Sequence, residues 1–131
     1  MNPRLANAAI GLIGVPFKLH GRNPATGLDC VGLVAAAMER AGYRPIAPQG
    51  YSLRALTVRP LLKFATASGL EPVDDQGDVW LAQVHALQFH LLIAAQGGAV
   101  HAHAGLGCVV FLPDPMTWPI VMRWRLADER M

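Results

Sequence analysis

The chain is poor in cysteine, in charge and in long apolar runs. Only two of its 131 residues are cysteine, which excludes a disulfide-rich scaffold, although Cys30 and Cys108 could still pair if the fold joined them. Charged residues make up 15% and the net charge is +2, so overall charge does not argue for nucleic acid or an anionic membrane as partner. Hydrophobic residues at 53% suffice for one core, and the length predicts a single domain over residues 1–131.

A targeting segment and a membrane span are not recognisable either. The first residues, MNPRLANAAIGLIGVPF, hold a short apolar run that Asn7, Gly11, Gly14 and Pro16 interrupt, with no clear signal-peptide core or cleavage site. The longest apolar runs fall short of the roughly 20 residues that cross a bilayer. We therefore expect synthesis in the cytoplasm without a signal peptide and no membrane insertion, so that any action outside the cell depends on another delivery route.

Helical patterns occupy the first half of the chain and strand patterns the second. Helices are expected over residues 2–14, directly after Asp29, and over residues 52–68 with Pro60 inside. Strands are expected over residues 79–87, 89–95, 99–102, 108–112 and 120–125, and a tight turn at Gly97 and Gly98 would pair two of them. This segregation predicts an α+β fold with N-terminal helices packed on a C-terminal antiparallel sheet.

Cys30 stands at the start of a predicted helix, in the stretch GLDCVGLVAAAMERAGY. A helix N-terminus lowers the pKa of a thiol, because its unpaired N–H groups and the helix dipole favour the thiolate. The same N–H groups can stabilise an oxyanion. Asp29 is expected to cap this helix. Cys30 is therefore a candidate nucleophile.

A nucleophilic thiol needs a base, and five histidines are available: His20, His85, His90, His101 and His103. His90 opens the run HLLIAA, and His101 lies in AVHAHAG. A turn at residues 97–98 would place these two side by side on one face. One ring nitrogen of His90 would then meet the thiol, and His101 would orient that ring through the other nitrogen.

Simpler interpretations of the same residues stay open. Cys30 can be a small buried side chain, and a histidine on a strand can be purely structural. Cys30 with the pair His101 and His103 could indicate zinc, but no Cys-x-x-Cys or acidic ligand supports it, so we expect no metal and no cofactor. Cys108, inside CVVFL, is expected in the core. The three tryptophans, Trp80, Trp118 and Trp124, are also expected there, with one of them lining a groove.

Three motifs in this chain resemble those of the NlpC/P60 cell-wall peptidases. The segment GVPFKLHGRNPATGLDCVGLV is similar to that family's nucleophile motif, which ends in D-C-S-G-L-V. GDVWLAQ resembles its G-D-[LV] strand entry, and FHLLIAAQGGAVHAH resembles its H-[VA]-G-I-Y…H-A hairpin. The three occur in the family's order and cover residues 14–104. Together they form a specific signature.

The resemblance implies a papain-like fold and hydrolysis of amide bonds in peptidoglycan stem peptides, often between D-γ-glutamyl and a diamino acid. Carried over by position, Cys30 would be the nucleophile, His90 the general base and His101 the third polar residue, with His103 as the less favoured choice. Asp29 and the residues matching the family's P-Y-x-x-G-G segment would position the thiol or the oxyanion.

Departures from the family pattern concern the surroundings of the thiol. Val31 replaces the common Ser after the cysteine, and D-C-V-G-L-V is more typical of a phage-tail and prophage branch. Phe17 replaces a Tyr whose hydroxyl helps to position the thiol or oxyanion. His20 stands where Gly is usual, as a polar group near the cleft or as a loop residue only. Leu92 replaces a small residue, which would narrow the cleft.

Three functions follow from these observations. The first is a peptidoglycan endopeptidase delivered to the cell wall by a phage-like particle, with phage-tail-like proteins as partners. The second is a structural tail-tip component that keeps the fold but has little activity, which Phe17 and Leu92 favour. The third is a papain-like amidase or acyltransferase with another small substrate.

Overall fold

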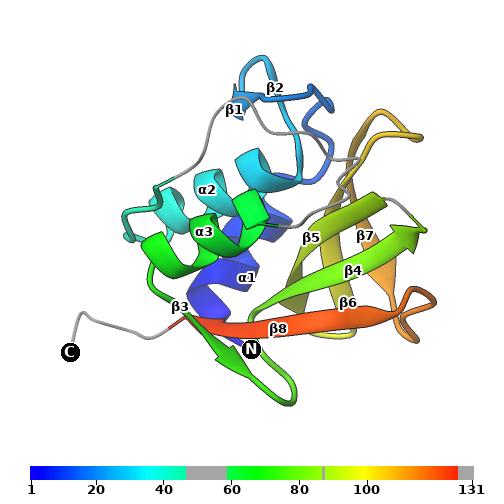
Figure 1. Ribbon diagram of the computed structural model, residues 1–131. Coiled ribbons are helices and arrows are strands. Elements are labelled where there is room, and N and C mark those ends of the chain that lie inside the picture. Colours follow the sequence, from blue (N-terminus) through cyan, green and yellow to red (C-terminus); the bar gives the residue numbers. More distant parts are fainter. Residues whose placement is uncertain (47–58, 87, 127–131) are drawn as a thin grey trace.

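The computed structural model describes residues 1–46, 59–86 and 88–126 and has the helices gathered on one side of a six-stranded sheet (Figure 1). The helices are α1 (Pro3–Ile10), α2 (Cys30–Arg40) and α3 (Arg59–Ala67). The sheet strands are β3 (Leu70–Val73), β4 (Val79–His85), β5 (Gln88–Ala95), β6 (Gly98–His103), β7 (Cys108–Pro113) and β8 (Ile120–Leu126). A separate ribbon consists of β1 (Arg22–Asn23) and β2 (Gly27–Leu28). The predicted α+β fold is confirmed.

The sheet is antiparallel throughout, with the strand order β3-β8-β4-β5-β6-β7. Residues 14–17 run along the outer edge of β7. The N–H of Gly14 donates to the Val109 carbonyl at 2.8 Å, and the N–H of Val109 donates to the Val15 carbonyl at 2.8 Å. These bonds protect an otherwise open sheet edge and attach the segment that leads to Cys30 to the strand beside β6.

Helix α2 is the centre of the main core rather than a one-sided surface helix. All nine residues from Cys30 to Met38 are buried, because α1 contacts it on one side and β5 and β6 on another. Its sequence is almost wholly apolar and small over this stretch, which suits a helix enclosed on all sides. Beyond its C-terminal end, Gly42 has a φ of +93°, the left-handed conformation that a glycine adopts readily after the end of a helix.

The two faces of the sheet carry separate apolar clusters, as the two-residue period of a strand dictates. The helix-facing side belongs to the main core, with Leu91 and Ile93 of β5 packed against α1 and α2. On the opposite side, Leu92 and its neighbours are covered by partly buried side chains. This second cluster consists of Ala82, Leu92 and Ala99 with Trp80, Leu112, Met116, Trp118 and Ile120. Strand β5 is therefore buried on both faces from His90 onward.

The predicted strands lie within two residues of the observed ones, whereas the ribbon of β1 and β2 was not predicted, and three further differences follow. Helix α1 ends at Ile10, and Gly11 is its C-cap, so it is shorter than the predicted 2–14. Strand β3 was not predicted. The hairpin turn lies at residues 96–97, because Gly98 already pairs with Ala95 in the sheet. Residues 52–58 of the third predicted helix lie outside the described residues.

None of the helices in the described ranges is long and apolar enough to cross a membrane. Both cysteines are free, so the disulfide that the sequence left open is absent. Cys108 is half-buried on β7 rather than a core residue.

Candidate active site

Cys30 is the first residue of α2, and Asp29 is its N-cap. The Asp29 carboxylate accepts hydrogen bonds at 2.8 Å from the N–H of Gly32 and at 2.8 Å from the N–H of His20. It also forms an ion pair with Arg22 at 3.2 Å. Asp29 is fully buried, whereas the Arg22 side chain is 30% exposed. The predicted cap is confirmed, and the same carboxylate also holds the preceding loop against the helix.

The loop approaches α2 so closely that only glycine fits at the contact. A Cβ atom added at Gly32 would overlap the carbonyl oxygen of Gly21. This contact gives a physical reason for Gly32 in the segment D-C-V-G-L-V. His20, on the same loop, is exposed and has a φ of +62°, a left-handed conformation that costs a side-chain-bearing residue about 1–2 kcal/mol. The position therefore favours Gly, as in the family pattern that this segment resembles.

His90 and His101 form a buried pair between strands β5 and β6. His90 Nδ1 lies 2.9 Å from His101 Nε2, and both residues are 2% exposed. Over the described residues, the second nitrogen of each ring, His90 Nε2 and His101 Nδ1, has no hydrogen-bond partner. One nitrogen of the 2.9 Å contact must carry a proton. The two rings are therefore joined by one hydrogen bond.

Aromatic rings surround His101 on the sheet face that carries the second cluster. His103 lies 5.4 Å from it and Trp118 5.2 Å from it between ring centroids, both in edge-to-face geometry. His103 itself is half-buried, and its Nδ1 accepts a hydrogen bond from the N–H of Leu106 at 3.0 Å. The structure thus pairs His90 with His101 and gives His103 a separate role in the turn after β6.

The thiol of Cys30 lies against β5 beside His90. The backbone N–H of Leu91, the residue after His90, interacts with this thiol, as does the N–H of Val31. The Asp29 carboxylate acts electrostatically on both Cys30 and His90. His90 Nε2 forms no hydrogen bond with the sulfur, since it has no partner among the described residues. Cys30 therefore contacts the backbone of β5 at the residue after His90, and no hydrogen bond joins its sulfur to His90 Nε2.

Burial controls the charge state of this site. Burial, with a smaller contribution from Asp29, raises the pKa of the Cys30 thiol to about 12, although the N–H groups of Leu91 and Val31 and the charge of Arg22 act to lower it. The expectation that the helix N-terminus lowers this pKa is therefore wrong, because the fully buried thiolate would lose its hydration. Burial also lowers the pKa of His90 to about 4 and that of His101 to about 3. All three groups are neutral at pH 7.

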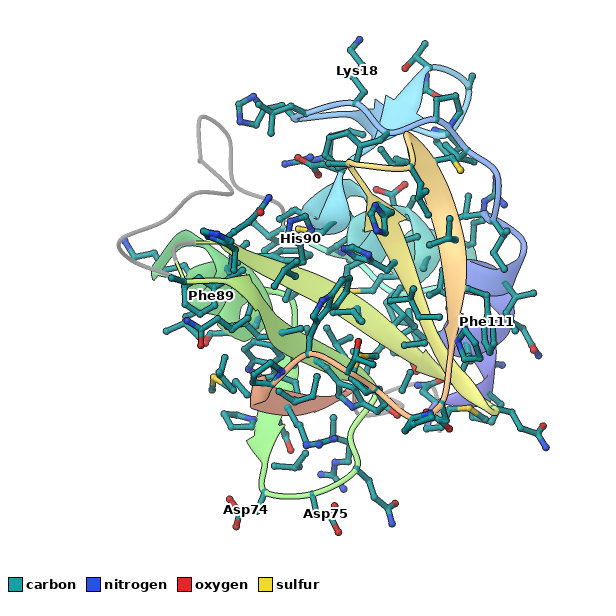
Figure 2. The ribbon with its side chains drawn as sticks, turned by 90° about the vertical axis from the view of Figure 1, so that its right-hand side faces the viewer. Lys18, Asp74, Asp75, Phe89, His90 and Phe111 are labelled. Carbon is teal, nitrogen blue, oxygen red and sulfur yellow. The ribbon has the colours of Figure 1, made fainter. Side chains whose placement is uncertain are left out.

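The other candidates lie outside this cluster. Phe17 packs against the main core, with its N–H donating to the Gly107 carbonyl at 2.8 Å. His85 is exposed at the end of β4. Lys18 projects into solvent from the loop before α2, whereas His90 lies inside the molecule (Figure 2). In the part of the chain that the structure describes, no three His, Cys, Asp or Glu side chains are grouped as a metal site requires.

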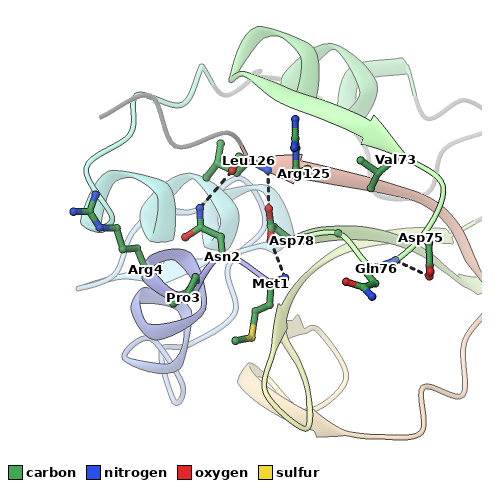
Figure 3. A pocket seen from close by; sticks show the side chains of 11 residues that line it. Met1, Asn2, Pro3, Arg4, Val73, Asp75, Gln76, Asp78, Arg125 and Leu126 are labelled. Atoms are coloured by element: carbon green, nitrogen blue, oxygen red, sulfur yellow. Dashed lines mark hydrogen bonds and ion pairs between the residues drawn. The ribbon is translucent and has the colours of Figure 1, made fainter. Parts of the chain in front are cut away.

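Away from Cys30 and the histidine pair, a hollow of about 550 Å³ lies between the start of α1 and the turn before β4 (Figure 3). Asp78 lines it, accepts a hydrogen bond from the N–H of Leu126 at 2.7 Å and lies 3.4 Å from the N-terminal amine. Asp74 and Asp75 of the same acidic run are exposed. Asp78 is thus a buried structural acid, and neither Cys30 nor the histidine pair lines this hollow.

Sequence reasoning missed two residues that contact the site. Arg22 lies eight positions before Cys30 in a loop without periodicity, so only its contact with Asp29 gives it a role. Trp118 was grouped with the other tryptophans as a core or groove residue. Trp124 is 1% exposed and belongs to the main core, but Trp118 packs on the rings of His101 and His103.

No family model matches the chain, and no curated protein matches it. Solved structures, in contrast, are similar to this chain. NlpC1 from Trichomonas vaginalis is 19% identical with a TM-score of 0.66, over 94% of this chain and 42% of that one. The NlpC/p60 domain of the peptidoglycan hydrolase SagA is 21% identical with a TM-score of 0.53, over 85% and 87%. An NLP/P60-family protein from Staphylococcus aureus, described as similar to lipoprotein, is 14% identical with a TM-score of 0.63, over 96% and 41%.

This chain therefore spans less than half the length of two of these proteins and most of the SagA domain. At these identities the likeness concerns the fold. It agrees with the three sequence motifs, which lie on the loop and helix around Cys30, on β4, and on the hairpin of β5 and β6. The chain thus has the papain-like α+β fold of the NlpC/P60 proteins.

Proposed function

We propose that this protein is a cysteine peptidase of the NlpC/P60 type that hydrolyses amide bonds in peptidoglycan stem peptides. The observation that carries the proposal is the histidine pair: His90 Nδ1 is 2.9 Å from His101 Nε2, and His90 Nε2 has no partner among the described residues. The Cys30 thiol interacts with the backbone N–H of Leu91, the residue after His90. A nucleophile, a base and a group that orients the base are the elements of cysteine-dependent acyl transfer. The name of the SagA neighbour, a peptidoglycan hydrolase, supports the substrate class.

The proton positions follow from the role of each ring. For His90 to act as a base through Nε2, that nitrogen must be unprotonated, so neutral His90 carries its proton on Nδ1 and donates it to His101 Nε2. Neutral His101 then carries its own proton on Nδ1. His101 thus fixes the tautomer and the ring orientation of His90 by accepting one hydrogen bond.

The reaction proceeds in two steps. His90 Nε2 takes the Cys30 thiol proton as the sulfur bonds to the peptide carbonyl carbon, and backbone N–H groups at the start of α2 stabilise the oxyanion. His90 then protonates the leaving amine, the C–N bond breaks and a thioester forms. In the second step His90 removes a proton from water, the hydroxide adds to the thioester, and the C–S bond breaks with the proton returning to sulfur.

The resting site is neutral, and this sets a condition on the reaction. Proton transfer from a thiol with a pKa of about 12 to an imidazole with a pKa of about 4 is strongly unfavourable. Both shifts arise mainly from burial, so opening the site to a polar peptide would move both pKa values toward their ordinary ranges. The substrate must therefore displace the groups that cover Cys30 before the chemistry starts.

We assign the cleaved bond to the D-γ-glutamyl–diamino acid linkage and the site of action to the cell wall, reached with a phage-tail-like particle. The motif resemblance supports both assignments, and the segment D-C-V-G-L-V supports the second. No cofactor is required in this mechanism.

The test is digestion of purified peptidoglycan with release of muropeptides read by mass spectrometry. Wild-type protein should release peptides cut at one linkage, and Cys30→Ala should lose almost all release while its circular dichroism spectrum is unchanged. Cys108→Ala is the matched control, because Cys108 is also a free thiol but is half-buried on β7, and it should keep wild-type release. Equal release from wild type and Cys30→Ala would refute the assignment of the nucleophile.

A non-enzymatic role as a structural tail-tip component is the second candidate. The full burial of Cys30 and its raised pKa favour it, since a neutral, enclosed thiol is inert. Stable association with tail-type proteins together with no muropeptide release from wild type would support this role. An amidase or acyltransferase with another small substrate would instead keep the reactivity of Cys30 toward a thiol probe and release no muropeptide.

A further inference from the structure

Trp118 contacts His101 on the side of the sheet opposite the helices. Its ring centroid lies 5.2 Å from that of His101 at an interplanar angle of 77°, and 6.3 Å from that of His103. It comes from the connection between β7 and β8, which covers Leu92 and Ala99 in the second cluster. Trp118 is half-buried, whereas His101 beneath it is 2% exposed.

The contact places an apolar ring where His101 would otherwise meet water. His101 Nδ1 is buried and has no hydrogen-bond partner among the described residues, so no polar group at that nitrogen compensates the positive charge that a second proton, on Nε2, would give the ring. In the mechanism above His101 must stay neutral, because a doubly protonated ring has no lone pair on Nε2 to accept the hydrogen of His90 Nδ1.

We propose that Trp118 is a positioning residue of the reaction, which keeps the His101 ring dry, neutral and edge-on so that His101 can orient His90. This inference rests on the proposed function for its role in turnover, but its physical part concerns the resting protein alone. The titratable groups around His101 also bear on its charge state. The titratable groups nearest the ring are His90 on β5 and His103 on its own strand, while Cys108 on β7 pairs with His103 in the sheet.

None of these groups favours a charged His101. Burial lowers its pKa to about 3, and both His90 and His103 add to the lowering. Asp29 is the acidic group that acts on the pair, and it acts on His90. Removing the indole would admit water to Nδ1 and raise the pKa of His101 toward its ordinary value of 6.5.

The experiment compares Trp118→Leu, Trp118→Phe and Trp80→Leu. Trp80 is the matched control, because it belongs to the same cluster but its ring contact is with the Arg123 guanidinium, 5.2 Å from the ring centroid. Nitrogen-15 NMR of the imidazoles is recorded from pH 5 to 8 in a Cys30→Ala background, and thermal unfolding shows that each variant is folded.

His101 should stay neutral over this range in the parent protein, in Trp80→Leu and in Trp118→Phe. In Trp118→Leu it should titrate within the range, with a midpoint of about 6, close to the ordinary value of 6.5 and well above the value of about 3 in the parent. With an active enzyme, the acid limb of kcat should move to the same midpoint in Trp118→Leu, which is a loss of about tenfold at pH 5, while KM changes little.

Two results would overturn the inference. One is a folded Trp118→Leu protein whose His101 stays neutral as in the parent, and the other is an equal shift in Trp80→Leu. If Trp118→Leu does not fold, Trp118→Met takes its place: a His101 midpoint that moves into the range from pH 5 to 8 supports the inference, and a His101 that stays neutral overturns it. If wild-type protein releases no muropeptide, the proposed function is refuted, but the NMR result on His101 is unchanged.

Discussion

Replacing Asp29 with Ala removes the carboxylate that joins the start of α2 to the loop before it. The carboxylate accepts from the N–H groups of Gly32 and His20, each at 2.8 Å, and pairs with Arg22 at 3.2 Å. All three partners lie within the segment that surrounds Cys30. The variant therefore tests whether this single buried side chain holds that segment in place.

The magnitude follows from the three partners. Loss of the N-cap costs about 1 kcal/mol. The His20 N–H loses a charged acceptor, which costs about 1.5 kcal/mol. The Arg22 side chain is 30% exposed, so water replaces much of the ion pair and its loss costs about 0.5 kcal/mol. We expect the free energy of unfolding to fall by about 3 kcal/mol in total, and the melting temperature by about 10 °C.

The assay is urea unfolding followed by circular dichroism, with Asp29→Asn and Asp75→Ala as companions. Asn is a good N-cap but lacks the charge, so Asp29→Asn should lose about half as much stability as Asp29→Ala. Asp75 is exposed and accepts a hydrogen bond from the adjacent N–H of Gln76, so Asp75→Ala should stay within about 0.5 kcal/mol of wild type. An Asp29→Ala protein as stable as Asp75→Ala would refute the account of this carboxylate.

Three further predictions concern the same region. Gly32→Ala should be destabilised by at least about 2 kcal/mol in the same assay, because its Cβ would overlap the Gly21 carbonyl oxygen; wild-type stability would show that the loop moves freely. His20→Gly should be more stable by about 1 kcal/mol, since the φ of +62° is then unstrained; a lower melting temperature would contradict this. Because the pKa values of His90 and His101 are lowered by folding, the stability that they contribute is present above pH 6.5 and is lost as the pH falls toward 4 and 3. His101→Gln should therefore make the melting temperature depend less on pH between 6.5 and 4, and an unchanged slope would refute the burial of a neutral His101.

The sequence predicted the strands well because each is a short apolar run bounded by glycine or proline. Gly97 marked the hairpin that brings His90 and His101 to one face, although the turn lies one residue earlier than predicted. Strand β3 escaped prediction because its four residues, LEPV, have a Pro inside and no alternation. Its place in the sheet depends on pairing with β8, a contact that local sequence does not encode.

The electrostatics of Cys30 were the part that sequence reasoning misjudged. A cysteine at a helix start predicts a lowered pKa only when solvent reaches the sulfur. Here residues from Cys30 to Met38 are all enclosed, and burial outweighs the N–H groups at the helix start. That enclosure comes from β5 and β6 packing against α2, which are contacts between distant segments. The role of Trp118 has the same origin, because its contact with His101 depends on the path of the connection between β7 and β8.

The hydrogen bonds between residues 14–17 and β7 have a consequence for the order in which the protein folds. They join the segment before Cys30 to β7, the strand beside the one that carries His101, across most of the length of the chain. Pairings of such high sequence separation are slow to form, because a long loop must close before they are rewarded. The arrangement of Cys30 next to β5 should consequently form late, in the same cooperative event that completes the sheet.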